Sequence, residues 1–114
     1  MQAEEIVRAV FERVHASDPT VSDLYAEDAV RYGHDGIVQR GRAAIAAFYQ
    51  DRFPIVPPFP EIETLLANPP YVAALLRLPE REGQPRWCLD LFEVEGGAIH
   101  TLRVLLEQVA AAAT

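Results

Sequence analysis

Apolar positions in the first half of the chain recur at helical spacing. Residues 3–15 place apolar side chains three and four positions apart, with Glu and Arg between them, which predicts a one-sided amphipathic helix. A second, short helix is expected after Asp18 and Pro19, because aspartate caps free backbone N–H groups and proline is tolerated in a first helical turn. A third helix should begin at Gly41 and extend to about Phe53, where the following proline ends it.

The segment between the second and third helices has the pattern of a hairpin. Residues 28–34 are typical of a short strand, Asp35 and Gly36 are a strong turn signal, and residues 37–40 return the chain. After the third helix, residues 53–60 hold four prolines in eight positions, which favours an extended loop.

The second half of the chain changes to strand-like alternation. Four candidate strands, residues 61–67, 71–81, 86–95 and 98–107, are separated by short turns rich in proline, glycine and polar residues. Strands joined in this way predict an antiparallel meander. Helices gathered at one end of the chain and strands at the other indicate an α+β fold with the helices on one face of the sheet.

Several of these strands are apolar on both faces. In the third strand of the meander, Leu89 and Leu91 face one way, while Cys88, Phe92 and Val94 face the other. A sheet with one solvated face alternates more cleanly than this. We therefore expect one face to meet the helices and the other to meet a second copy of the chain, giving a homodimer through the sheet.

Composition and charge narrow the class of protein. The 114 residues are enough for a single domain, residues 1–114, and the net charge of -7 disfavours nucleic acid and anionic membranes as partners. Cys88 is the only cysteine, so neither an internal disulfide nor a cysteine-based metal site is possible. No secretion signal, membrane-length apolar run, phosphate loop or dinucleotide fingerprint is evident, so we expect a cytoplasmic protein without metal or cofactor.

Three stretches resemble a known superfamily. The segments "LYAEDAV", "RGRAAIAAFY" and "CLDLFEVEGGAIHTLRV" are similar to the nuclear-transport-factor-2-like (NTF2-like) superfamily, especially its SnoaL-like and ketosteroid-isomerase-like members, and the order of elements agrees. The resemblance implies a cone-shaped, curved antiparallel sheet wrapped around three helices, the cystatin-like roll. It also implies a cavity at the wide end of the cone and a dimer. The fold hosts isomerases, cyclases, dehydratases, hydrolases and proteins without a reaction.

The resemblance also assigns positions to the catalytic groups of ketosteroid isomerase. The general-base aspartate of that enzyme corresponds here to Gly33, and the tyrosine of its first helix corresponds to Val10. Its third group, a carboxylic acid kept neutral in an apolar site, corresponds to Glu93. One of the three roles thus has an occupant.

His34 and Asp35 are the candidates for the missing base. His34 comes one residue after the Gly33 position, and Asp35 could orient it. Histidine side chains in general titrate near neutral pH, which suits proton transfer. In the alternative interpretation the two residues only shape a type I′ hairpin turn.

Glu93 alternates in phase with Trp87, and the two could share a cavity wall. The alternative is a solvated position at the rim. Arg31 shares its strand face with Gly33 and either points inwards to pair with Glu93 or lies outside. Asp90 falls on the opposite strand face and is interpreted as structural or interfacial.

Five large side chains could line a ligand pocket, or could simply be core. They are Tyr32, Tyr49, Phe53, Trp87 and Leu91. The first functional hypothesis is a protein that binds a small hydrophobic ligand and catalyses proton-transfer chemistry of the isomerase, dehydratase or hydrolase type through His34, Glu93 and Asp35. The alternative is a non-catalytic ligand-binding or dimerisation module on the same fold.

Overall fold

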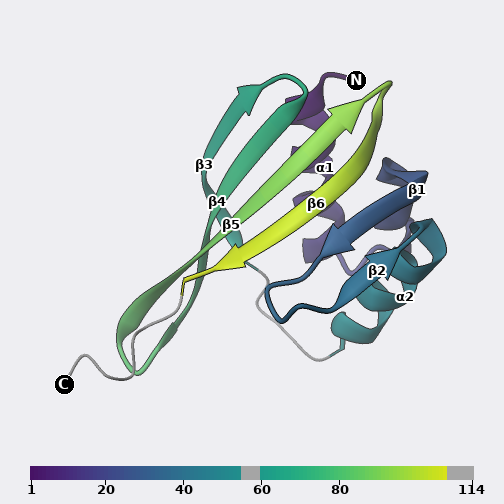
Figure 1. Cartoon of the computed structure of the whole chain (residues 1–114). Coiled ribbons are helices and arrows are strands. Elements are labelled where there is room, and N and C mark those ends of the chain that lie inside the picture. The colour runs from purple at the N-terminus through teal and green to yellow at the C-terminus, as the bar shows by residue number, and fades with distance from the viewer. Residues whose placement is uncertain (55–59, 108–114) are drawn as a thin grey trace.

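The computed structural model describes residues 1–54 and 60–107, which form helices packed on one six-stranded sheet (Figure 1). The helices are α1 (Ala3–His15), the 3-10 helix η1 (Pro19–Leu24) and α2 (Arg42–Arg52). The strands are β1 (Tyr25–Tyr32), β2 (Val38–Arg40), β3 (Glu61–Asn68), β4 (Tyr71–Arg81), β5 (Gln84–Glu95) and β6 (Ala98–Leu106). The expected extended loop over residues 53–60 lies largely outside the described residues. No helix in the described part of the chain has the length and hydropathy needed to cross a membrane.

The helix boundaries follow from local chemistry. The Asp18 carboxylate accepts hydrogen bonds from the Thr20 backbone N–H at 2.9 Å and the Thr20 hydroxyl at 2.7 Å, which caps η1. Gly41 precedes α2 at a φ of 92°, a conformation that favours glycine, and its N–H donates to the Ala29 carbonyl at 2.7 Å. This bond ties the start of α2 to β1.

The sheet has the strand order β2-β1-β6-β5-β4-β3. Strands β3 to β6 form the predicted antiparallel meander, and β1 pairs with β2 as the predicted hairpin. The sheet is not antiparallel throughout, as the sequence had led us to expect: β1 pairs with β6 in parallel. Such a parallel pair joins segments distant in the chain, and turn signals describe only neighbouring strands. The α+β class is confirmed.

The hairpin turn between β1 and β2 has His34 and Asp35 at its centre. The Gly36 N–H donates to the Gly33 carbonyl at 3.1 Å, and the Gly33 N–H donates to the Ile37 carbonyl at 2.9 Å. Gly36 has a φ of 84°, whereas Asp35 is not among the described residues with positive φ. The turn is therefore a type I turn followed by a left-handed glycine, and the expected type I′ turn, which needs two positive φ angles, is corrected.

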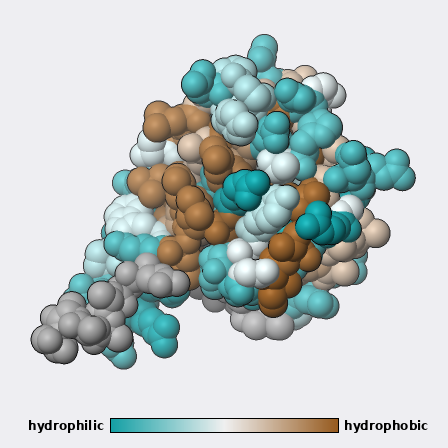
Figure 2. All heavy atoms as spheres, viewed as in Figure 1, coloured by the Kyte–Doolittle hydropathy of each residue, from teal (hydrophilic) through white to brown (hydrophobic). Residues whose placement is uncertain are grey.

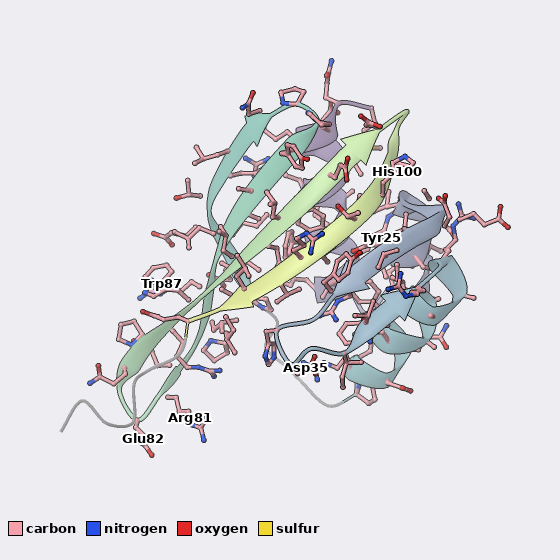
Figure 3. The ribbon with its side chains drawn as sticks, viewed as in Figure 1. Tyr25, Asp35, Arg81, Glu82, Trp87 and His100 are labelled. Carbon is pink, nitrogen blue, oxygen red and sulfur yellow. The ribbon has the colours of Figure 1, made fainter. Side chains whose placement is uncertain are left out.

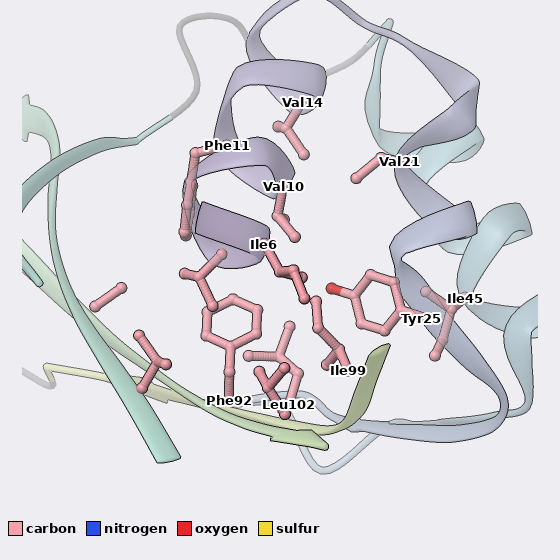
Figure 4. Packing of buried hydrophobic residues seen from close by; sticks show 14 of the residues in the cluster. Ile6, Val10, Phe11, Val14, Val21, Tyr25, Ile45, Phe92, Ile99 and Leu102 are labelled. Atoms are coloured by element: carbon pink, nitrogen blue, oxygen red, sulfur yellow. The ribbon is translucent and has the colours of Figure 1, made fainter. Parts of the chain in front are cut away.

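All three helices cover the same face of the sheet (Figure 1). Figure 4 shows side chains of α1, including Phe11, pointing at Phe92 and Leu102 on the sheet, with Tyr25 and Ile45 beside them. The Phe11 and Phe92 rings meet edge to face with centroids 6.1 Å apart. This packing sets which face of each strand is inside.

Candidate functional site: an apolar cavity with a buried carboxyl group

A cavity of about 350 Å³ lies between the helices and the inner face of the sheet, a size that accommodates a small ligand. Its wall is mostly apolar and combines side chains from α1 with side chains from β4 and β6: Val10, Phe11, Val14, Leu76, Leu102 and Val104. Polar groups enter this wall at few points, and they come from β1, β5, α2 and the hairpin turn.

Asp90 is the polar group of β5 that lines the cavity. Its side chain is 8% exposed, and burial raises the pKa of its carboxyl group from 3.8 to about 6, since the charged form loses water. The Cys88 thiol, which donates a hydrogen bond to Asp90 Oδ1 at 3.4 Å, and the positive charge of Arg31 both oppose this rise in pKa. A carboxyl group that titrates this close to neutral pH can both take and give a proton.

Arg31 reaches the same cavity from β1. Its side chain is 9% exposed, its Nη1 donates to Gln39 Oε1 at 3.0 Å, and its Cζ lies 3.7 Å from the centroid of the Phe48 ring. The amide oxygen and the ring face both compensate for the lost hydration of the guanidinium. The positive charge of Arg31 favours negative charge near it in the cavity.

Tyr49 of α2 lines the cavity and is paired with the fully buried Tyr25 of β1. Their hydroxyl oxygens lie 2.6 Å apart in a hydrogen bond that either group can donate. Burial raises the pKa of Tyr49 to about 12 and that of Tyr25 well above its ordinary value, so both hydroxyls are neutral at physiological pH. When Tyr25 donates, the Tyr49 hydrogen is free for a ligand in the cavity.

Cys88 also faces the cavity but is not a ready nucleophile. Burial and the negative charge of Asp90 raise the pKa of its thiol to about 12. The thiolate is the reactive form of cysteine, so Cys88 acts here as a small hydrogen-bond donor to Asp90.

His34 lines the cavity from the hairpin turn, and its side chain is exposed. Asp35 is not part of the cavity wall. Its Oδ1 accepts the Ile37 N–H at 2.9 Å, and this bond lowers the pKa of the Asp35 carboxyl group. No hydrogen bond joins His34 to Asp35 among the described residues, so the carboxylate shapes the turn at the hairpin tip labelled in Figure 3.

Glu93 lies on the outer face of the sheet, which corrects the expectation that it shares the cavity wall. Residues of β5 alternate between faces, and Asp90 and Phe92 are buried under the helices, which turns Glu93 away from them. Its Oε1 accepts a hydrogen bond from the Thr101 hydroxyl at 3.1 Å. Asp90 thus occupies the inner position that the sequence interpretation gave to Glu93.

The aromatic and aliphatic candidates divide between the two faces. Trp87 and Leu91 share the outer face with Glu93, and so does Tyr32, whose ring lies 4.1 Å from the Cζ of Arg103. Phe53 stacks on Tyr49 with centroids 6.3 Å apart and supports it without lining the cavity. Tyr49 is the member of this set that lines the cavity.

A side chain at Gly33, where the resemblance places a catalytic aspartate, would crowd its neighbours. A Cβ atom there would lie 2.7 Å from Asp35 Oδ1, 3.0 Å from the Ile37 carbonyl oxygen and 3.2 Å from Arg31 Nη1. The guanidinium and the turn occupy the space. Val10, at the position of the catalytic tyrosine, is a buried apolar part of the wall.

Comparisons with known proteins agree with this architecture. The family model of the SnoaL-like domain matches residues 7–101. The chain is similar in structure to a protein from Sphaerobacter thermophilus, with 24% identity over 96% of this chain and 99% of that chain and a TM-score of 0.77. An NTF2-like protein of unknown function from Cytophaga hutchinsonii gives a TM-score of 0.79 at 12% identity, with coverage of 94% of this chain and 91% of that chain.

A third similar structure, from Sinorhizobium meliloti, belongs to a protein with a provisional assignment as a polyketide cyclase. It gives a TM-score of 0.78 at 19% identity over 91% of this chain and 99% of that chain. No curated protein has a sequence that matches this chain. The fold defines an NTF2-like protein of the cystatin-like roll type. Within that superfamily, the chain belongs to the SnoaL-like family.

Proposed function

We propose that this protein binds a small, mainly hydrophobic molecule in its cavity and transfers a proton on it through Asp90. The observation that carries the proposal is the Asp90 carboxyl group, buried in an apolar wall with a pKa raised to about 6. General acid–base catalysis is most effective when the pKa of the catalytic group lies near the working pH.

The neighbours of Asp90 suit a reaction at a carbon next to a carbonyl group. Ionised Asp90 takes the proton from that carbon. The electron pair of the broken C–H bond forms a C=C bond, and the π pair of the C=O bond moves onto the carbonyl oxygen. The Tyr49 hydroxyl and the positive charge of Arg31 stabilise the negative oxygen. Protonated Asp90 then gives the proton to another carbon, which completes an isomerisation. In a ring closure it gives the proton to the oxygen formed when the enolate carbon attacks a second carbonyl group, and in an elimination to the oxygen that leaves. The provisional assignment of the Sinorhizobium meliloti protein agrees with small-molecule chemistry on this fold.

His34 is proposed as a second proton carrier. Its exposed ring at the edge of the cavity connects the interior with solvent, so it suits exchange of protons with water. Asp35 supports this role only indirectly, by holding the turn.

The non-catalytic alternative has its own support. Gly33 and Val10 stand where the resemblance places two catalytic groups, and a Cβ atom at Gly33 would crowd Asp35, Ile37 and Arg31. A chain that binds apolar ligands but moves no proton on them would fit this alternative.

The test combines a titration with a general assay for proton abstraction. Carbon-13 NMR should show the Asp90 carboxyl titrating near pH 6, and ring opening of nitrobenzisoxazole should accelerate as Asp90 ionises. Asp90→Asn should abolish this acceleration but still bind nitrobenzisoxazole. Shifts of the Val10 and Leu76 methyl signals on adding the compound would show that it binds. Equal rates in both proteins would refute the catalytic proposal and leave the binding function.

We also propose that the outer face of the sheet joins two copies of the chain. Leu75, Leu89 and Leu105 are direct neighbours across β4, β5 and β6, and Leu66 on β3 is 67% exposed. Figure 2 views this face and shows hydrophobic side chains gathered over β3 to β5. A contiguous apolar surface of this kind is typical of an interface.

A further inference from the structure

The charged side chains in the cavity wall of this acidic protein are mainly cationic. The chain has a net charge of -7, yet Arg31, Arg52 and Arg86 line the cavity, and His34 adds a ring N–H. Asp90 is the one carboxylate among the described lining residues. The local charge is therefore opposite in sign to that of the whole chain.

None of the three cavity arginines forms an ion pair with a carboxylate of the described residues. The one ion pair among residues 1–54 and 60–107 is between Arg8 and Glu4 on α1, far in the chain from the cavity arginines. Arg52 has its Cζ 5.4 Å from the Phe48 ring centroid, and Arg86 comes from the opposite wall on β5. Both guanidinium groups thus keep donors available for an anion.

The three arginine side chains lie at different depths in the cavity. Arg52 is exposed and Arg86 is half-buried, which puts them at the rim, whereas Arg31 is buried and already engaged with Gln39 and Phe48. Between rim and interior the wall is apolar. A molecule with a hydrophobic body and one anionic end would bury the body and leave the charged end, still partly hydrated, at the rim that Arg52 and Arg86 line.

Resting on the function proposed above, we propose that the ligand of this cavity is an amphipathic carboxylate, held by Arg52 and Arg86 at the rim with its apolar body inside. Planar guanidinium groups bind carboxylates through paired N–H donors, which selects a carboxylate over a neutral or cationic head group. The overall negative charge of the chain repels anions elsewhere on the surface, so a preference for an anionic head group has to come from cationic side chains of the cavity.

The experiment uses three probes with the same apolar body, decanoate, decanol and decylamine, each below its aggregation concentration. Calorimetric titration should give decanoate an affinity about tenfold higher than decanol, with decylamine weakest, because each partly exposed ion pair contributes up to about fivefold. The advantage of decanoate should shrink as salt is added, while decanol binding stays constant.

Arginine variants assign the preference to the rim. Arg52→Gln and Arg86→Gln should each weaken decanoate binding by about threefold and together remove its advantage, with decanol binding unchanged in all variants. Arg81→Gln is the matched control, since Arg81 lies at the far tip of the β4–β5 hairpin (Figure 3) and should change nothing.

The outcomes separate this inference from the proposed function. Equal affinity for decanoate and decanol, or an unchanged preference in the double variant, would overturn the carboxylate assignment while the cavity remains a ligand site. Failure of all three probes to bind would overturn both the assignment and the binding function.

Discussion

The hydroxyl groups of Tyr25 and Tyr49 lie 2.6 Å apart in the interior and join β1 to α2. Both rings are buried, with centroids 6.1 Å apart, and the fully buried Tyr25 hydroxyl has Tyr49 as its partner in place of water. The pair thereby positions Tyr49 in the cavity wall as well as holding the helix on the sheet.

Removing one hydroxyl of this pair should destabilise the protein. Tyr25→Phe or Tyr49→Phe leaves the partner hydroxyl buried and unpaired, at a cost of about 1 to 3 kcal/mol in free energy of unfolding. The double variant should cost less than the sum of the two, which a double-mutant cycle in urea measures. Tyr71→Phe, on an exposed ring, is the control and should change little. Additive effects would show that the hydroxyls do not depend on each other.

The stability of the protein should depend on the protonation of Asp90. Its folded pKa of about 6 lies above the ordinary value of 3.8, so its contribution to stability is fully present below about pH 4 and is lost as the pH rises through 6. At 1.36 kcal/mol per pKa unit, the difference corresponds to about 3 kcal/mol. Urea unfolding of the wild type and of Asp90→Asn from pH 4 to 7 isolates the contribution of Asp90 to the free energy of unfolding. Over this range the wild type should lose stability relative to the variant. Asp51→Asn, at an exposed carboxyl group, is the control. If the free energies of unfolding of the wild type and of Asp90→Asn changed in parallel with pH, the raised pKa of a buried Asp90 would be contradicted.

Gly33→Ala should destabilise the hairpin although it adds one methyl group. The new Cβ would lie 2.7 Å from Asp35 Oδ1 and 3.0 Å from the Ile37 carbonyl oxygen. The Asp35 carboxylate, which accepts the Ile37 N–H, must then move, at a cost of about 1 to 2 kcal/mol. Thermal melts measure the cost. In an Asp35→Ala background the same substitution should cost less, because one of the close contacts is gone. Equal costs in both backgrounds would locate the strain at the backbone contact alone.

His34→Ala should separate function from stability. The side chain is exposed at the turn, so the free energy of unfolding should change by less than about 0.5 kcal/mol. Turnover of any substrate identified for the cavity should fall strongly if His34 passes protons to solvent. Asp35→Asn should reduce turnover less. If His34→Ala lowered the melting temperature substantially together with turnover, the role of His34 would be purely structural.

Assembly should depend on the outer face of the sheet. The Leu105 side chain is 57% exposed and adjoins Leu89, so Leu105→Glu should convert a dimer to monomers without unfolding them. Sedimentation velocity measures the mass. Ile37→Glu, at a similarly exposed apolar position in the hairpin, is the control and should leave the dimer intact. A wild type that is monomeric at every concentration would refute the interface.

The sequence by itself determined the elements and their order, because each depends on short-range chemistry. The periodicity of residues 3–15, the Asp18 cap and the Gly41 start specify helices at the places where the structure has them. Turn signals likewise separate the four strands of the meander. The family resemblance added the curved sheet and the cavity, neither of which follows from periodicity alone.

The tertiary structure decided which face of each strand is inside. On β5 both sets of alternating residues are apolar, so Glu93 and Asp90 were equally suited to the cavity until the packing of Phe92 on Phe11 selected one phase. A one-residue difference in phase exchanges the two faces completely. The tertiary structure also decided the contact of Arg31 with Phe48 and the Tyr25–Tyr49 pair, which join residues 17 and 24 positions apart in the chain. Burial is set by such distant contacts, and it is burial that gives Asp90 its raised pKa.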